Sequence, residues 1–212
     1  GDVYKRQGIV VHAWVSSIRA RTGAQCVWLL GHSEGGLVAL AASRAPEGIC
    51  GLILVSAPGR PLGTVLREQL HANPANAPLL DQADHAITEL EAGRRIDAST
   101  LHPALAPLFR ANVQGFLISA MALDPAKLVA AYRGPVQILQ GERDIQVSPQ
   151  DAALLAQAQP KAELRLLPDT NHVLKVVTTD DRAANLATYA DPGLPLAPQI
   201  VPDIAAFVRA RR

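Results

Sequence analysis

Aromatic side chains and an excess of charge of either sign are both scarce in this 212-residue chain. Phe, Trp and Tyr together make up 4% of the residues, and the formal net charge at pH 7 is +1. A net charge this close to zero provides no general attraction to nucleic acid or to an anionic membrane surface, so neither partner is expected. No apolar run approaches the ~18 residues of a membrane-spanning helix, so no membrane span is expected either.

Cysteine is also rare, and its two occurrences are Cys26 and Cys50. Neither belongs to a C-x-x-C pair or to another spacing typical of a metal site. Each lies in a short apolar run that is typical of a strand, and the two strands are expected to be neighbours. We therefore expect two buried, reduced thiols, and we expect no metal and no other cofactor.

The most informative stretch covers residues 26–36 and reads C-V-W-L-L-G-H-S-E-G-G. Its first five residues are typical of a strand buried on both faces, and residues 36–43 have a helical pattern. Between them lies a G-x-S-x-G motif centred on Ser33, in the strand–turn–helix context that presents a nucleophile. Gly31 and Gly35 are expected to let the backbone pass without a Cβ clash. The alternative, a glycine-rich turn with a capping serine, is disfavoured by the flanking strand and helix.

The rest of the chain alternates between predicted strands and helices. Apolar runs predict further strands near residues 49–55, 136–140 and 162–167, and helical patterns cover residues 9–22, 151–158 and 203–211. With 49% hydrophobic and 18% charged residues, the chain can bury a sizeable core. This alternation predicts an α/β fold with a mostly parallel sheet, whose active site lies at the carboxyl ends of the strands.

Residues 61–133 interrupt this alternation, because they contain helical pieces and no convincing strand. A single crossover rarely needs so many residues, so we expect a helical cap inserted into a core made of residues 8–60 and 134–212. Ordinary crossover helices are the alternative. Two apolar stripes at helical spacing support the insertion: Leu80, Ala83, Ile87 and Leu90 in one, and Val113, Phe116, Leu117, Ala120 and Met121 in the other.

Three residues with catalytic chemistry follow predicted strands in the order Ser33, Asp144, His172. This is the chain order of the α/β hydrolases, which the sequence resembles in G-H-S-E-G-G at 31–36, G-E-R-D-I-Q-V at 141–147 and D-T-N-H-V-L at 169–174. Within that superfamily it is most similar to lysophospholipase-like and serine-aminopeptidase-like hydrolases with a helical cap. The resemblance implies Ser33 as nucleophile, His172 as general base, Asp144 as the acid and the Glu34 backbone N–H as one oxyanion donor.

The expected reaction is hydrolysis of a carboxylic ester or thioester through an acyl-enzyme, with a small-molecule acyl substrate. A peptide amide is the alternative substrate, and a non-catalytic binding module or an incomplete fragment is the alternative to an enzyme. Asp169 and Glu142 are weaker alternatives to Asp144. Substrate contacts are expected from three residues, namely His32, Phe116 and Met121. The oligomeric state stays open.

The beginning of the chain, G-D-V-Y-K-R-Q at residues 1–7, resembles a translated sequencing adapter and is treated as non-native. The family resemblance starts near residue 8 and covers only the carboxyl-terminal half to two thirds of the fold. No H-G motif that would supply a second oxyanion donor occurs in the chain. Only four strands are predicted, whereas the sheet of the family usually has about eight, so we expect three or four further strands, on the order of 50–100 residues, to precede residue 8 in the complete protein.

Overall fold

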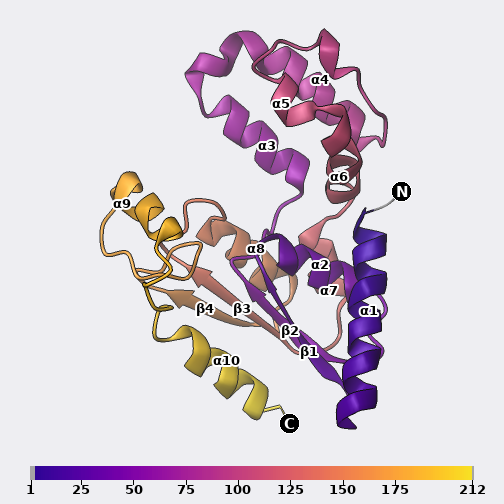
Figure 1. The fold of residues 1–212 in the computed structure, drawn as a ribbon, viewed down its shortest axis with the longest axis vertical. Coiled ribbons are helices and arrows are strands. Elements are labelled where there is room, and N and C mark those ends of the chain that lie inside the picture. The colour runs from indigo at the N-terminus through magenta and orange to yellow at the C-terminus, as the bar shows by residue number, and fades with distance from the viewer. Residues whose placement is uncertain (1–2, 212) are drawn as a thin grey trace.

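The computed structural model describes residues 3–211, which form a four-stranded parallel sheet flanked by helices (Figure 1). The strands lie side by side in chain order, and they are β1 (Val27–His32), β2 (Ile49–Val55), β3 (Val136–Gly141) and β4 (Glu163–Leu167). Each strand matches its sequence prediction to within two residues. The expected fold class, α/β with a mostly parallel sheet flanked by helices, is confirmed.

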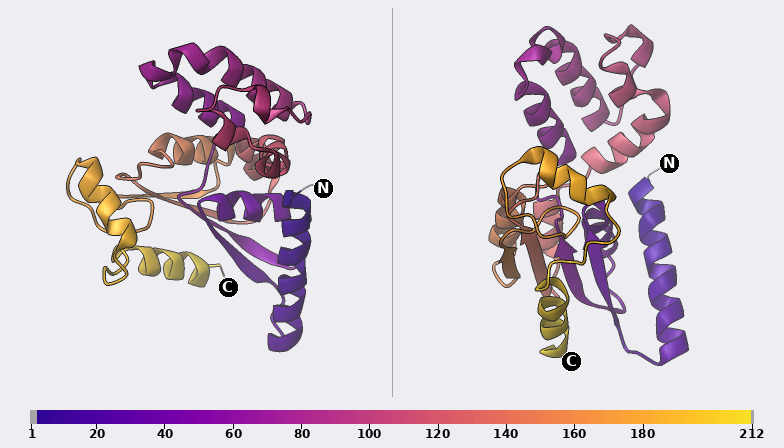
Figure 2. Two further views of the ribbon diagram at one scale, coloured as in Figure 1. Left: turned by 45° about the horizontal axis from the view of Figure 1, so that its top comes forward. Right: turned by 60° about the vertical axis from the view of Figure 1, so that its left-hand side comes forward.

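The side chains of β2 alternate between two hydrophobic cores, as the two-residue period of a strand requires. Leu52 and Leu54 belong to the core beneath α2 (Glu34–Ala42), α7 (Pro125–Ala131) and α8 (Pro149–Ala158). Ile53 and Val55 belong to the core on the opposite face, which α10 (Ile200–Arg209) covers. Figure 2 shows the sheet between these two layers. Both faces of the central strands are covered, so β2 and β3 are buried along almost their whole length. The expectation that the first strand is buried on both faces is wrong, because β1 lies at the edge of the sheet and its Leu30 is 53% exposed.

Helix α1 (Val3–Thr22) packs against α2 beside β1, which is an edge strand of the sheet. The sequence predicted a helix here, but only Val15 of its apolar stripe is fully buried, and Trp14 is 61% exposed. Residues 3–7, within the segment that resembles an adapter, form the first turns of α1, and Tyr4 is buried. The origin of residues 1–7 stays a prediction.

Four helices stand above the carboxyl ends of the strands, and we call them the cap helices (Figure 1). They are α3 (Leu62–His71), α4 (Leu80–Glu91), α5 (Ala106–Phe109) and α6 (Ala111–Met121). They enclose a hydrophobic cluster of their own, which includes Ile87, Phe109 and Met121. Helix α7, within the segment expected to form the cap, packs instead against α2 and α8 of the core. The remaining short helices are η1 (Pro74–Leu79), η2 (Ala98–Thr100), α9 (Arg182–Ala187) and η3 (Thr188–Ala190).

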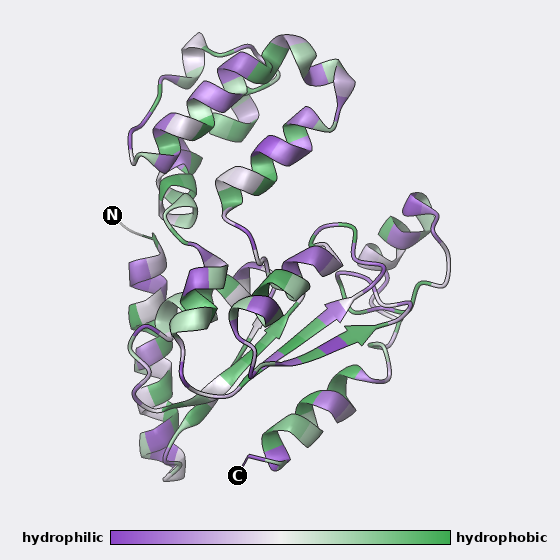
Figure 3. Cartoon of the chain, turned by 180° about the vertical axis from the view of Figure 1, so that it is seen from behind, coloured by the Kyte–Doolittle hydropathy of each residue, from purple (hydrophilic) through white to green (hydrophobic). Residues whose placement is uncertain are grey.

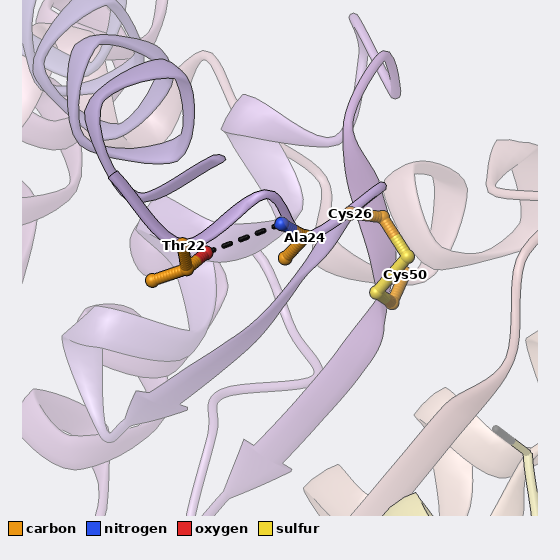
Figure 4. The surroundings of a disulfide bond; sticks show 4 residues. All are labelled: Thr22, Ala24, Cys26 and Cys50. Carbon is orange, nitrogen blue, oxygen red and sulfur yellow. Dashed lines mark hydrogen bonds between the residues drawn. A yellow bond between two sulfur atoms is a disulfide. The ribbon is translucent and has the colours of Figure 1, made fainter. Parts of the chain in front are cut away.

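Cys26 and Cys50 form a disulfide bond and are only partly buried, so the expectation of buried, reduced thiols is wrong (Figure 4). Cys26 directly precedes β1, and Cys50 is the second residue of β2. Because Val27 pairs with Ile49, the Cα atoms of the two cysteines lie 5.0 Å apart. The sequence placed both cysteines in neighbouring strands but did not give the register, which decides whether two sulfur atoms can meet. The bond encloses β1, the Ser33 turn and α2 in one loop.

Hydrophobic residues predominate in the strands, whereas most helices carry hydrophobic and hydrophilic residues together (Figure 3). Within residues 3–211, no single helix is long and apolar enough to cross a membrane. Helices α6 and α7 have the length and apolar composition of a membrane span only when they are taken together, and the pair is bent by 42°.

Candidate active site

Ser33 occupies the sharp turn between β1 and α2, at the carboxyl edge of the sheet. Its backbone has φ 54° and ψ −124°, a conformation that residues other than glycine rarely adopt. The Ser33 N–H donates a hydrogen bond of 2.9 Å to the Val55 carbonyl at the end of β2, which holds the turn in place. Such a strained backbone persists only where the surrounding structure enforces it, and strained residues of this kind are found most often at functional sites.

The glycines around Ser33 differ in what they contribute to this turn. A Cβ at Gly31 would lie 2.2 Å from the Gly35 carbonyl oxygen, so Gly31 allows the close approach that the sequence predicted. At Gly35 the prediction is wrong, because a Cβ there would meet nothing within 4 Å. The second constrained position is Gly36, where a Cβ would lie 2.4 Å from the Ala57 Cβ. Gly36 therefore lets α2 pack closely on the residues that follow β2.

Ser33, His172 and Asp144 form one hydrogen-bonded chain. His172 Nδ1 donates to Asp144 Oδ2 at 2.8 Å, and His172 Nε2 lies 3.0 Å from Ser33 Oγ. With its proton on Nδ1, the imidazole has a free lone pair on Nε2 and can accept the hydroxyl proton of Ser33. His172 is 4% exposed and Asp144 is 8% exposed, so the two groups interact out of bulk water.

The Asp144 carboxylate accepts hydrogen bonds from several directions. Oδ1 accepts from the backbone N–H groups of Gln146 at 2.8 Å and Val147 at 2.9 Å, and Oδ2 also accepts from Gln140 Nε2 at 3.2 Å. Burial by itself raises the pKa of Asp144, but the hydrogen bonds from His172, Val147 and Gln146 outweigh burial and lower the pKa below its usual value. Asp144 is therefore an anion at neutral pH.

The two alternative acids lie away from the imidazole. Asp169 Oδ1 is 3.5 Å from Arg143 Nε, and the Asp169 side chain is 45% exposed. Glu142 is exposed. Of the three carboxylates considered from the sequence, Asp144 is the one that the structure places against His172.

His172 reaches Ser33 because its loop crosses over the end of β3. A Cβ at Gly141 would lie 2.2 Å from the Thr170 carbonyl oxygen, so only glycine lets the loop pass this closely. His32 Nε2 donates a hydrogen bond of 2.7 Å to the His172 carbonyl, and the two imidazole rings are 4.9 Å apart. His32 thus contacts the backbone of the candidate base, in addition to any contact it makes with a substrate.

A small cavity of about 220 Å³ opens beside Ser33, between the core and the cap helices. Its lining is mainly apolar and includes Leu37, Leu62, Val65, Phe116, Ala120 and Leu123. Phe116, which is expected to contact the substrate, lines this cavity together with Ser33. Met121 is buried in the cluster of the cap helices and does not line this cavity. A larger cavity of about 490 Å³, lined by Arg44 and Lys127 among others, does not include any of the three candidate catalytic residues.

Glu34 is the first residue of α2, and its side chain is exposed. The first N–H groups of a helix have no acceptor within the helix, so the Glu34 N–H is available to an anion that forms beside Ser33. The Glu34 carboxylate accepts a hydrogen bond of 3.1 Å from the Tyr4 hydroxyl. Burial, together with this carboxylate, raises the pKa of Tyr4.

Several polar residues that hold the site in place give no signal in the sequence. Gln140 donates to Asp144, as described above. Asp151 is 2% exposed and accepts two hydrogen bonds from Arg60, at 3.0 and 2.9 Å, which fixes the segment between β2 and the cap helices to α8. Such an arginine–aspartate pair is not visible in a sequence, because its members lie far apart along the chain. Within the described residues, no group of three or more His, Cys, Asp or Glu side chains is arranged to hold a metal ion.

Comparisons with known proteins agree with this architecture. The model of the alpha/beta hydrolase family matches residues 4–199. BpoC from Mycobacterium tuberculosis H37Rv, a proposed non-heme bromoperoxidase, superimposes with a TM-score of 0.58 at 15% identity, over 100% of this chain and 76% of its own. At this identity the similarity establishes the fold alone.

Two further structures have lower scores. A thermophilic esterase from Thermogutta terrifontis has a TM-score of 0.48 at 19% identity, over 91% of this chain and 68% of its own. A hydrolase from Pseudomonas aeruginosa PA01 has a TM-score of 0.48 at 20% identity, over 77% of this chain and 63% of its own. The chain thus spans 63–76% of the length of these three proteins. A comparison with curated protein sequences found no match.

Proposed function

Because this chain belongs to the alpha/beta hydrolase family, we propose that it is a serine hydrolase with Ser33 as its nucleophile. The observation that carries the proposal is the hydrogen-bonded chain from Ser33 through His172 to Asp144. A serine hydroxyl is a weak nucleophile until a neighbouring base accepts its proton, and His172 Nε2 is within reach to do so. The proposed substrate is a carboxylic ester or thioester.

In the first half of the reaction, Ser33 Oγ attacks the carbonyl carbon while its proton passes to His172 Nε2. Asp144 keeps the imidazole in the tautomer that can accept this proton, and it stabilises the imidazolium that results. The tetrahedral intermediate carries a negative charge on the former carbonyl oxygen. The Glu34 N–H, at the positive end of α2, donates to this oxyanion.

The intermediate collapses when His172 returns the proton to the leaving oxygen or sulfur, and an acyl group remains on Ser33 Oγ. Water then attacks this acyl-enzyme, giving its proton to His172 as it adds to the carbonyl carbon. The second intermediate expels Ser33 Oγ, which recovers the proton from His172. The products are a carboxylic acid and an alcohol or thiol, and the protein returns to its starting state.

The cavity beside Ser33 supports an apolar acyl group of modest size as the part of the substrate that binds. Its volume of about 220 Å³ is below the ~300–1,000 Å³ of sites that enclose drug-sized molecules. Arg60 also lines it, but Asp151 and Glu68 already pair with its guanidinium, so this cation is not free for an anionic substrate. A peptide amide is the alternative substrate class, since the same acyl-transfer chemistry applies.

A fluorophosphonate probe tests the proposal, because it reacts covalently with activated serine residues. We expect labelling of the wild-type chain and none of Ser33→Ala, while the exposed Ser17→Ala variant serves as a control with wild-type labelling. Equal labelling of wild type and Ser33→Ala would refute the assignment of the nucleophile. A folded wild-type chain that takes up no probe would instead favour a non-catalytic binding module or an incomplete enzyme.

A further inference from the structure

Three polar side chains outside the proposed catalytic chain connect the two loops that carry Asp144 and His172. We call residues 142–148 the acid loop and residues 168–177 the base loop. Asn171 lies in the base loop and is 0% exposed, and Asn185 lies on α9 and is 3% exposed. Thr188 follows α9 and is half-buried. None of these three residues takes part in the proposed reaction.

Asn171, the residue before His172, forms hydrogen bonds through both polar atoms of its side chain. Its Nδ2 donates to Asn185 Oδ1 at 3.1 Å and to Thr188 Oγ1 at 2.7 Å, which uses both protons of the amide. Its Oδ1 accepts from the Lys175 N–H at 3.0 Å. Because Asn171 is joined directly to His172 in the chain, these bonds fix the backbone from which the imidazole projects.

Asn185 also contacts the acid loop. Its Nδ2 donates a hydrogen bond of 2.7 Å to the carbonyl of Arg143, the residue before Asp144. Thr188 Oγ1 donates to the Asn185 carbonyl at 2.8 Å, which completes the connection. One side chain on α9 therefore accepts from the residue before the candidate base and donates to the residue before the candidate acid.

We infer that Asn185 is a positioning residue that sets the separation between Asp144 and His172, and that Asn171 and Thr188 act with it. The inference rests on the proposed function, because this separation matters only if His172 is the base. The acid and base loops follow different strands, so their relative position depends on contacts between them. A buried, fully paired polar network holds one geometry more strictly than apolar packing does.

The magnitude follows from how strongly acyl transfer depends on geometry. A displacement of about 1 Å at a catalytic group lowers the rate by on the order of 10²-fold. We expect Asn185→Ala to lower kcat by about tenfold to a hundredfold, with KM unchanged, because the substrate cavity is lined by other residues. A role limited to overall stability would lower the melting temperature without this selective loss of kcat in the folded protein.

Substitution of Thr188 tests the same network without leaving a cavity at the buried position of Asn185. We expect Thr188→Val to lower kcat and Thr188→Ser to restore it, since serine keeps the oxygen that accepts from Asn171. Asp180→Ala is the matched control: Asp180 pairs with Arg143 of the same acid loop, but its carboxylate is 89% exposed. An exposed ion pair contributes little, so this variant should keep wild-type kcat.

The experiment measures kcat and KM of each variant for a p-nitrophenyl ester, with circular dichroism to confirm folding. Wild-type kcat in folded Asn185→Ala and Thr188→Val would overturn the inference, and so would a change confined to KM. If Asn185→Ala does not fold, the inference is tested by Thr188→Val and Thr188→Ser alone: equal kcat values for these two variants would overturn it. A wild-type protein without Ser33-dependent turnover would overturn the proposed function, and this inference with it.

Discussion

Replacing Asp144 with asparagine removes one charge from the proposed catalytic chain while nearly preserving its shape. The amide oxygen can keep the two hydrogen bonds that Oδ1 now accepts from Gln146 and Val147. The amide nitrogen then takes the place of Oδ2, which lies 2.8 Å from His172 Nδ1. Two N–H donors cannot face each other, so the imidazole proton moves to Nε2.

With the proton on Nε2, His172 faces Ser33 Oγ with a donor and can no longer accept the hydroxyl proton. In serine proteases with the same triad, this substitution lowers kcat by about 10⁴-fold. Four factors of ten correspond to about 5.4 kcal/mol of lost transition-state stabilisation. We expect a loss of this order for Asp144→Asn.

The assay compares kcat/KM of wild type, Asp144→Asn and Asp169→Asn for a p-nitrophenyl ester, with thermal unfolding as the check on folding. Asp169 is the matched control, because its partly exposed carboxylate contacts Arg143 at 3.5 Å and not the imidazole. We expect Asp169→Asn to retain activity close to that of wild type. A larger loss for Asp169→Asn than for Asp144→Asn would refute the assignment of the acid.

Three further predictions concern the cavity beside Ser33, the disulfide and a buried carboxylate. Phe116→Ala should change relative kcat/KM across p-nitrophenyl esters of different chain length, since one methylene is worth about 1–3 kcal/mol in an apolar pocket; Met121→Ala should lower stability and leave that profile unchanged. Serine at both Cys26 and Cys50, 24 residues apart, should lower the free energy of unfolding in urea by about 3–4 kcal/mol, and no loss would contradict this. Burial raises the pKa of Asp151, but the hydrogen bonds from Arg60, Gly59 and Ser148 have the larger effect, so the pKa is lower in the folded protein than in the unfolded chain. The ionised carboxylate therefore stabilises the fold above about pH 4, and this contribution is lost as the pH falls below that value. Urea unfolding from pH 7 to 3 should therefore show a steeper loss in wild type than in Asp151→Asn.

The strands and the Ser33 turn could be predicted because their signals are local. An apolar run, a glycine-flanked serine and a helical pattern are contiguous, so the sequence shows their order and position directly. The apolar stripe of α4 was equally informative, and Ala83, Ile87 and Leu90 are all buried. Proximity of Ser33, Asp144 and His172 was expected for a similar reason, since the carboxyl ends of parallel strands meet at one edge of the sheet.

Features that depend on register or on distant partners could not be predicted. Whether Cys26 meets Cys50 depends on how β1 pairs with β2, and the apolar pattern of a strand does not specify that pairing. Met121 belongs to a helical stripe, but the stripe does not say which residues face the cluster of the cap helices and which face the cavity. Asn185 lies on a six-residue helix without an apolar stripe, and its partner Arg143 is 42 residues away.

The central claim is that Ser33 carries an acyl group during turnover, and mass spectrometry of the quenched protein tests it most directly. The chain is mixed with an excess of an activated ester, stopped in acid during turnover and digested. We expect the mass of the acyl group on the peptide that contains Ser33, and its absence from Ser33→Ala. Two results would contradict the account: turnover with the acyl group on another residue, or no acylated peptide in a chain that releases p-nitrophenol in a burst, since a burst means that deacylation limits the rate and the acyl-enzyme accumulates.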